Sequence, residues 1–157
     1  QVHRHGVDGA VAVAGHLVSF VALAAACGKS DTAAVAVRPL DVHGAWARPA
    51  ASGLVSAVYL VIVNRDTAPV TFIGAASALA ESVSLHETME MGGMVHMMPL
   101  DSAQVIAAND SLVLAEGAKH LMVTGLRRKL AAGDSLPLTL SFAGNKTIVL
   151  MAAVRAP

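Results

Sequence analysis

The chain has 157 residues, of which 55% are hydrophobic, and its 11 basic and 11 acidic side chains give a formal net charge of zero. This length suits one domain with a substantial core and is too short for two comfortable ones. The balanced charge and the aromatic content of 3% argue against a nucleic-acid-binding protein, which needs a basic surface and aromatic rings for stacking on bases.

The N-terminal segment has the order of an export leader. A short basic start around Arg4 precedes a mostly apolar run at residues 10–26, which ends in small residues. This order is that of a secretory signal peptide. We therefore expect residues 1–27 to be a signal or lipoprotein leader, residues 28–36 to be a linker, and residues 37–157 to form the domain.

The single cysteine, Cys27, directly follows the small residues that end the apolar run. This arrangement resembles a bacterial lipoprotein processing site, at which the cysteine is acylated, although Leu23 stands one position further from the cysteine than usual. An uncleaved anchor is the alternative, because an apolar run of about 17 residues is marginal for spanning a bilayer. Both interpretations predict a periplasmic or other extracytoplasmic domain, which meets the membrane only through its N-terminal lipid or leader.

The rest of the chain has the pattern of an all-β protein. Short apolar runs are separated by Gly, Pro, Asn and Asp at intervals of about ten residues, and no segment shows a helical period. The predicted strands are 40–46, 55–64, 70–75, 82–87, 95–98, 103–107, 111–115, 120–124, 136–142 and 146–154. So many short strands predict a Greek-key β-sandwich or barrel with its loops at the ends. One of these loops would be the Met-rich segment between His86 and Pro99.

Three of the predicted strands have clear patterns. Residues 55–63 are almost continuously apolar, which indicates a central strand covered on both sides. In residues 136–142, large apolar residues alternate strictly with Pro, Thr and Ser, which predicts one buried and one exposed face. Pro137 in this strand favours an edge position or the first pairing residue. The alternation resumes at residues 148–154 after residues 143–145, which suit a tight hairpin turn.

Soft metal ligands gather in residues 85–122. This segment holds six of the seven methionines and three of the seven histidines. They are Met89, Met91, Met94, Met97, Met98, Met122, His86, His96 and His120. Thioether sulfur and imidazole nitrogen select Cu(I) over hard cations. Because side chains alternate along a strand, His120 and Met122 would share an outward face while Leu121 and Val123 point into the core. Two donors on one face can share a metal.

These residues also have other interpretations. Methionine also fills gaps in cores and forms adhesive surfaces, and this suits several of the methionines taken singly. A blue-copper centre is excluded because it needs a cysteine thiolate, and no cysteine follows residue 27. An enzyme is not expected, because His86 lacks a second histidine at the spacing of a zinc hydrolase helix, and neither a Gly-x-Ser-x-Gly motif nor a carboxylate pair is visible.

Several tracts of the domain match one known family. They are Ala45–Arg48, Tyr59–Leu60, Asn64, Leu85–Thr88, Met94–Pro99, His120–Met122 and Leu130–Asp134. Through these tracts, residues 37–154 resemble the bacterial periplasmic copper chaperones called the PCu(A)C family. The resemblance implies a cupredoxin-like fold. It also implies a copper motif that consists of a His, ten residues, a Met, twenty-one residues and His-x-Met.

The copper ligands that the resemblance implies are His86, Met97, His120 and Met122. His86 and Met97 enclose the ten residues of the motif, whereas Met97 and His120 enclose 22, one more than expected. We treat the extra residue as an insertion around Asn109 and Asp110. Met98 is the alternative ligand, because counting from it restores the second spacing but spoils the first.

The resemblance further implies an extracytoplasmic metallochaperone for Cu(I), with Cu(II) as a second option. Its partner would be a copper-accepting protein, either the cytochrome c oxidase subunit with the dinuclear copper centre or another copper chaperone. A mobile loop carrying Met97 would suit release of the metal. The alternatives are a copper-scavenging or storage lipoprotein without a delivery partner, and a metal-free immunoglobulin-like interaction module.

Overall fold

The computed structural model describes residues 39–100 and 103–156. The expected leader, Cys27 and the linker lie outside these residues. The described part of the chain consists of ten β-strands and contains no helix, and so no helix that could cross a membrane. The all-β prediction is confirmed.

All ten predicted strands are present. They are β1 (Leu40–Ala47), β2 (Ser56–Asn64), β3 (Val70–Ala76), β4 (Ser82–Met91), β5 (Met94–Pro99), β6 (Gln104–Ile106), β7 (Ser111–Leu114), β8 (Lys119–Thr124), β9 (Ser135–Phe142) and β10 (Lys146–Val154). Every predicted end lies within one residue of the observed end, except that β4 continues to Met91.

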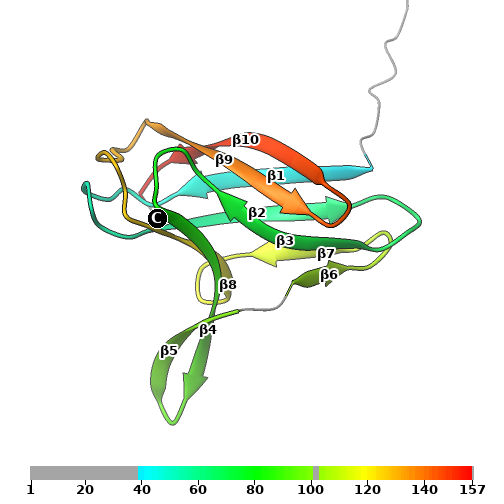
Figure 1. Ribbon diagram of the computed structural model, residues 1–157. Helices are drawn as coiled ribbons and strands as arrows, with labels where there is room; N and C mark the ends of the chain where they lie inside the picture. Colours follow the sequence, from blue (N-terminus) through cyan, green and yellow to red (C-terminus); the bar gives the residue numbers. More distant parts are fainter. Residues whose placement is uncertain (1–38, 101–102, 157) are drawn as a thin grey trace, which may run out of the picture. The chain divides into compact units, whose positions relative to one another are not determined.

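The strands form one hydrogen-bonded sheet in the order β5-β4-β8-β2-β1-β10-β9-β3-β6, and β7 also pairs with β2. The neighbours are antiparallel except β1 and β10, which run parallel. The sheet curls, so that β3 also contacts β4 and β6 also contacts β7 (Figure 1). Its interior is filled by buried side chains that include Leu60, Phe72, Leu121, Leu138 and Phe142.

The strand patterns account for this core. β2 lies between β1 on one side and β7 and β8 on the other, as expected of a central strand. The alternating apolar residues of β9 are all buried. Pro137 lies in β9, which is an interior strand, yet its cross-strand partner is Met151 of β10, and the pairing with β3 extends only as far as Thr139. Pro137 is therefore paired with β10 alone, like a residue of an edge strand. Its missing N–H interrupts no ladder on the β3 side.

The prediction of a loop between His86 and Pro99 is wrong, because this segment is a β-hairpin. β4 and β5 pair from His86 with Pro99 up to Met91 with Met94. The connection is Gly92–Gly93 with φ of 62° and 78°. Positive φ at both central residues is the type I′ turn, whose twist matches that of the flanking strands. Figure 1 shows the hairpin extending beyond the other strands, with β5 at the edge of the sheet.

A buried amide, Asn64, holds the end of β2 to the loops around it. Its Nδ2 donates to the carbonyl oxygens of Ala68 (2.9 Å), Ile106 (3.2 Å) and Ala107 (2.9 Å). We expect Asn64→Ala to lower the free energy of unfolding by about 1–3 kcal/mol, because it leaves buried carbonyls without donors. Urea unfolding would measure the change.

The control for this experiment is Asn145→Gly, in the exposed turn between β9 and β10. Asn145 has φ of 58°, which glycine adopts freely, so this variant should differ by only a few tenths of a kcal/mol. Equal stabilities of the two variants would contradict the role assigned to Asn64.

Candidate metal centre

The pairing of β4 with β8 brings three of the predicted ligands together. His86 lies directly opposite His120, and Ser84 lies opposite Met122. Paired residues of antiparallel strands share a face, and residues two apart on a strand share it too. His86, His120 and Met122 therefore lie on one face of the sheet, and the two imidazole rings have centroids 6.1 Å apart.

The pairing of β4 with β5 places Met97 on this same face. Met97 is opposite Thr88, which is two residues from His86, while Met98 is opposite Glu87 on the reverse face. The structure thus brings Met97 to the side of the sheet that carries the histidines. Met98 points to the other side.

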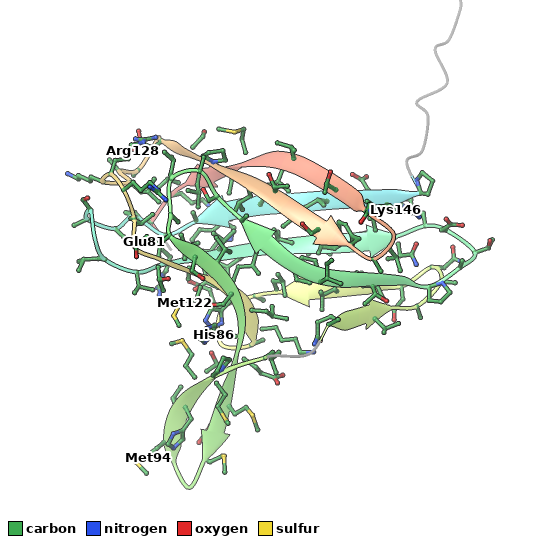
Figure 2. All side chains as sticks on the ribbon, viewed as in Figure 1. Glu81, His86, Met94, Met122, Arg128 and Lys146 are labelled. Carbon is green, nitrogen blue, oxygen red and sulfur yellow. The ribbon has the colours of Figure 1, made fainter. Side chains whose placement is uncertain are left out.

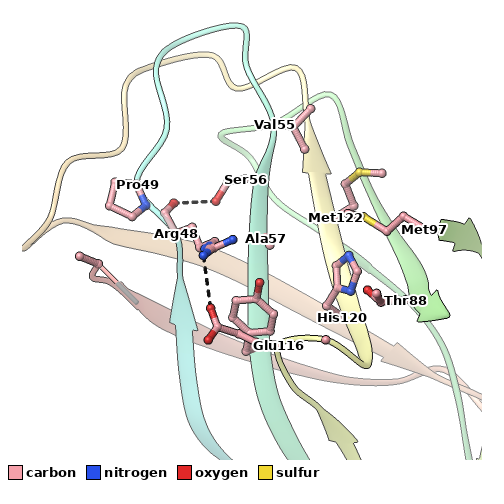
Figure 3. Close-up of a pocket in the computed structure, with 13 residues that line it drawn as sticks. Arg48, Pro49, Val55, Ser56, Ala57, Thr88, Met97, Glu116, His120 and Met122 are labelled. Carbon is pink, nitrogen blue, oxygen red and sulfur yellow. Dashed lines mark hydrogen bonds and ion pairs between the residues drawn. The ribbon is translucent and has the colours of Figure 1, made fainter. Parts of the chain in front are cut away.

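A pocket of about 800 Å³ opens on this face. Met97, His120 and Met122 are among its lining residues, together with Tyr59 and Thr88. Figure 3 shows the thioethers of Met97 and Met122 next to each other, beside the His120 ring. His86 lies outside the pocket lining and reaches the group through its contact with His120. Figure 2 shows it where the hairpin joins the rest of the sheet.

The predicted outward face is more covered than expected. Leu121 and Val123 are in the core as predicted, but His120 and His86 are only 5% and 8% exposed. Met122 is half-buried, and Met97 is 58% exposed. The sequence predicts an outward face for His120 and Met122, and of these two side chains His120 is covered rather than open to solvent. Solvent reaches the group mainly at Met97.

Within the described residues, His120 uses one ring nitrogen for a hydrogen bond to the backbone. Its Nδ1 lies 3.1 Å from the carbonyl oxygen of Ala118, which can only accept. Nδ1 is therefore the protonated nitrogen, and Nε2 carries the lone pair. A backbone carbonyl that fixes the tautomer in this way is a common partner of metal-binding histidines. The Tyr59 ring packs beside the imidazole, with centroids 6.2 Å apart.

His86 has one ring nitrogen bonded and the other unpartnered. Its Nε2 lies 3.0 Å from the Ser84 hydroxyl, while Nδ1 is buried and has no hydrogen-bond partner in the part of the chain that the structure describes. Buried polar atoms nearly always have a partner, so an orphan requires an explanation. If Nε2–H donates to Ser84, Nδ1 has a lone pair on the face that also carries His120. This arrangement fits a bound metal ion.

The pKa of His86 is lowered from its ordinary value, first by burial and then by repulsion from His120. The unfolded chain therefore binds a proton at this site more readily than the folded domain. Stability from this group is complete above the ordinary pKa of 6.5 and is lost as the pH falls through the lowered pKa. We expect the metal-free domain to unfold at lower temperature at pH 5 than at pH 7.5.

Thermal unfolding of variants would test this pH dependence. His86→Gln should flatten the pH dependence, whereas His96→Gln, at an exposed position of β5, should retain it. A wild-type melting temperature that is the same at both pH values would contradict the expectation.

The donors in this group are soft. Within residues 39–100 and 103–156, no three side chains of His, Cys, Asp or Glu come together as a ligand set. The other two described histidines lie away from this group. His43 is exposed, with its Nε2 3.2 Å from Oδ2 of Asp41, and His96 lies on the reverse face of the hairpin.

Sequence reasoning missed Ser84, although its position two residues before His86 on a predicted strand is a signal that the two share a face.

Comparisons with known proteins agree with the fold. A family model described as "LpqE-like: Putative lipoprotein LpqE-like" matches residues 40–154. "Putative lipoprotein Lxx21020" of Leifsonia xyli subsp. xyli (strain CTCB07) is 34% identical over 108 residues, which cover 69% of this chain and 64% of that protein. "Uncharacterized protein RP573" of Rickettsia prowazekii (strain Madrid E) is 27% identical over 104 residues, or 64% of this chain and 58% of that one. The matched region thus spans less than two thirds of either relative.

Solved structures with the same fold include copper-binding domains. Apo-DR1885 from Deinococcus radiodurans is 29% identical, with 95% of this chain and 97% of that one covered and a TM-score of 0.56. Its Cu(I) form is 30% identical, with coverage of 77% and 83% and a TM-score of 0.57. The copper-bound PCuAC domain from PmoF2 is 24% identical, with coverage of 78% and 97% and a TM-score of 0.62, and shows likeness of fold. The chain therefore belongs to the LpqE-like family, and its β-domain has the cupredoxin-like fold of PCuAC domains.

Proposed function

We propose that this domain is an extracytoplasmic Cu(I) chaperone, not an enzyme, and that it carries Cu(I) as cargo between two imidazoles and two thioethers. The ligands are His86, Met97, His120 and Met122. The observation that carries the proposal is the buried, unpartnered Nδ1 of His86 next to a second imidazole, on the strand face that also holds both sulfurs. The Cu(I) form of DR1885, which has the same fold, supports the choice of metal.

The protonation states of the donors favour Cu(I) near neutral pH. Thioethers have no proton to lose, and Cu(I) prefers such soft ligands to oxygen. Imidazole must be neutral to bind a metal. The lowered pKa of His86 keeps its ring neutral, and the Ala118 carbonyl directs the free nitrogen of His120 away from the backbone.

The placement of the four donors suits release as well as binding. His86, His120 and Met122 lie on paired strands within the sheet, whereas Met97 is on the edge strand of the projecting hairpin and is the most exposed of the four. Loss of Met97 from the ligand set would open the site to an acceptor. A site without thiolate can pass copper downhill to cysteine ligands, and we propose the dinuclear centre of cytochrome c oxidase as the acceptor.

The leader belongs to the same proposal. Export through residues 1–27, with lipid attachment at Cys27 and a linker at residues 28–36, would place residues 37–157 outside the cytoplasm. The family description and the Leifsonia relative, both called lipoproteins, support this localisation. Mass spectrometry of the mature N-terminus tests whether Cys27 is acylated.

Competition with a Cu(I) chelator tests the function directly. Under anaerobic conditions, the isolated domain should take at least one equivalent of Cu(I) from a chelator of micromolar affinity. A domain that takes none would refute the proposal. Transfer of the bound copper to an apo oxidase copper-centre fragment would then distinguish a chaperone from a storage protein, which would keep its metal.

A further inference from the structure

The reverse face of the β4–β5 hairpin carries a second group of soft donors. Met89 lies directly opposite His96, and Met91 lies directly opposite Met94. Each pair shares a face, and the two pairs are two residues apart along both strands, so all four side chains are on one face. Met97 is on the other face because it is adjacent to His96 in the same strand.

The spacing of these four residues is that of a compact cluster. Directly opposed residues have Cβ atoms about 4.5–5.5 Å apart, and residues two apart on a strand are separated by roughly 6.5–7 Å. A methionine side chain has three rotatable bonds, so its sulfur can move over several ångströms. Three sulfurs and one imidazole can therefore converge on one ion above this face.

Packing does not account for these methionines. Met89, Met91 and Met94 are 41%, 56% and 63% exposed, and His96 is exposed as well. Exposing this much apolar surface at the tip of a hairpin has no benefit for folding. Figure 2 shows Met94 at the far end of the hairpin, well away from His86 and Met122. The cluster is thus separate from the candidate metal centre.

We propose that Met89, Met91, Met94 and His96 form a second Cu(I) site, on the outer face of the hairpin. Its donors are of the two soft types that select Cu(I), and it contains no thiolate. All four side chains are exposed in the described part of the chain, so metal ions can reach them from solvent. This inference goes beyond the proposed function and does not depend on it, because the two sites share no residue.

The experiment measures Cu(I) stoichiometry under anaerobic conditions. The wild-type domain should bind two equivalents, and the triple variant M89L/M91L/M94L should bind one. Leucine has nearly the volume of methionine but no sulfur, and at exposed positions it should leave the melting temperature unchanged. The matched control is Met151→Leu, an exposed methionine on β10 that is 59% exposed, and it should still bind two equivalents.

A spectroscopic readout on the unmodified protein makes the test independent of the variants. Addition of Ag(I), a redox-inert substitute for Cu(I), should shift the ε-methyl NMR signals of Met89, Met91 and Met94, whereas the signal of Met151 should stay in place. Unshifted signals of the three hairpin methionines would overturn the inference. So would an unchanged stoichiometry in the triple variant, which would leave this face as an apolar contact surface.

Failure of the second site can be distinguished from failure of the proposed function. The variant M97L/M122L disrupts the first site, and it should retain one equivalent, which is lost when the hairpin substitutions are added. If the first site does not exist, the wild-type domain binds one equivalent and the triple hairpin variant binds none. If the second site does not exist, the wild-type domain binds one equivalent and the triple hairpin variant keeps it.

Discussion

Replacement of Met97 by leucine should lower the affinity of the proposed chaperone site for Cu(I) by more than about 100-fold, whereas Met98→Leu should leave it unchanged. The two methionines are neighbours on β5 and are similarly exposed, at 58% and 48%. They differ in direction: Met97 is opposite Thr88 on the histidine face, and Met98 is opposite Glu87 on the reverse face. Loss of a ligand should exceed the 10- to 100-fold effect of losing a partner that only orients a ligand.

Both substitutions should be made in the M89L/M91L/M94L background. The hairpin cluster then binds no copper, and chelator competition reports the remaining site alone. Because the two changes are chemically identical, any general effect of removing a sulfur from β5 appears in both variants. Equal affinities for the two variants would contradict the assignment of Met97, and a larger loss for Met98 would reverse it.

The choice between Met97 and Met98 shows what a spacing motif can and cannot predict. The count from His86 favours Met97, and the count back from His120 favours Met98. Counting leaves the choice open, because one residue inserted in the connection from β5 to β8 would change the second spacing without moving either strand. The register of β4 with β5 places only Met97 on the histidine face, since a shift of one residue moves a side chain to the opposite face.

The strands themselves were largely predictable. Alternation of apolar and polar residues, as in β9, and turn residues such as Gly144 and Asn145 determined nearly all the boundaries. The hairpin was missed because its strands expose both faces, so residues 88–98 show no alternation between buried and exposed types. The Gly92–Gly93 pair was the available signal, since two glycines between strands favour a type I′ turn.

The environment of the two histidines was not predictable. His86 and His120 are far apart in the sequence, and their burial depends on the pairing of β4 with β8 and on Tyr59 from β2. The tautomer of His120 depends on a backbone carbonyl, which has no signature in the sequence. Residue types thus indicated soft donors, while the availability of their lone pairs came only from the fold.

His120→Asn should lower the affinity for Cu(I) at the chaperone site by more than about 100-fold. The substitution removes the imidazole nitrogen that the Ala118 carbonyl leaves free, and the harder amide of asparagine is a poor ligand for Cu(I). His120 is only 5% exposed, so the variant will also lose some stability, and its melting temperature without metal must be measured first. Chelator competition is then carried out at a temperature where both proteins are folded.

The control for this variant is His43→Asn, which makes the same chemical change at an exposed position of β1 beside Asp41. It should bind Cu(I) like the wild type, because His43 lies on another strand, outside the β4, β5 and β8 group that carries the four donors. A His120→Asn domain that is folded and still binds copper at wild-type affinity would show that the free imidazole nitrogen has no part in binding. The unpartnered Nδ1 of His86 would then need a different explanation, and the four-ligand site would have to be abandoned.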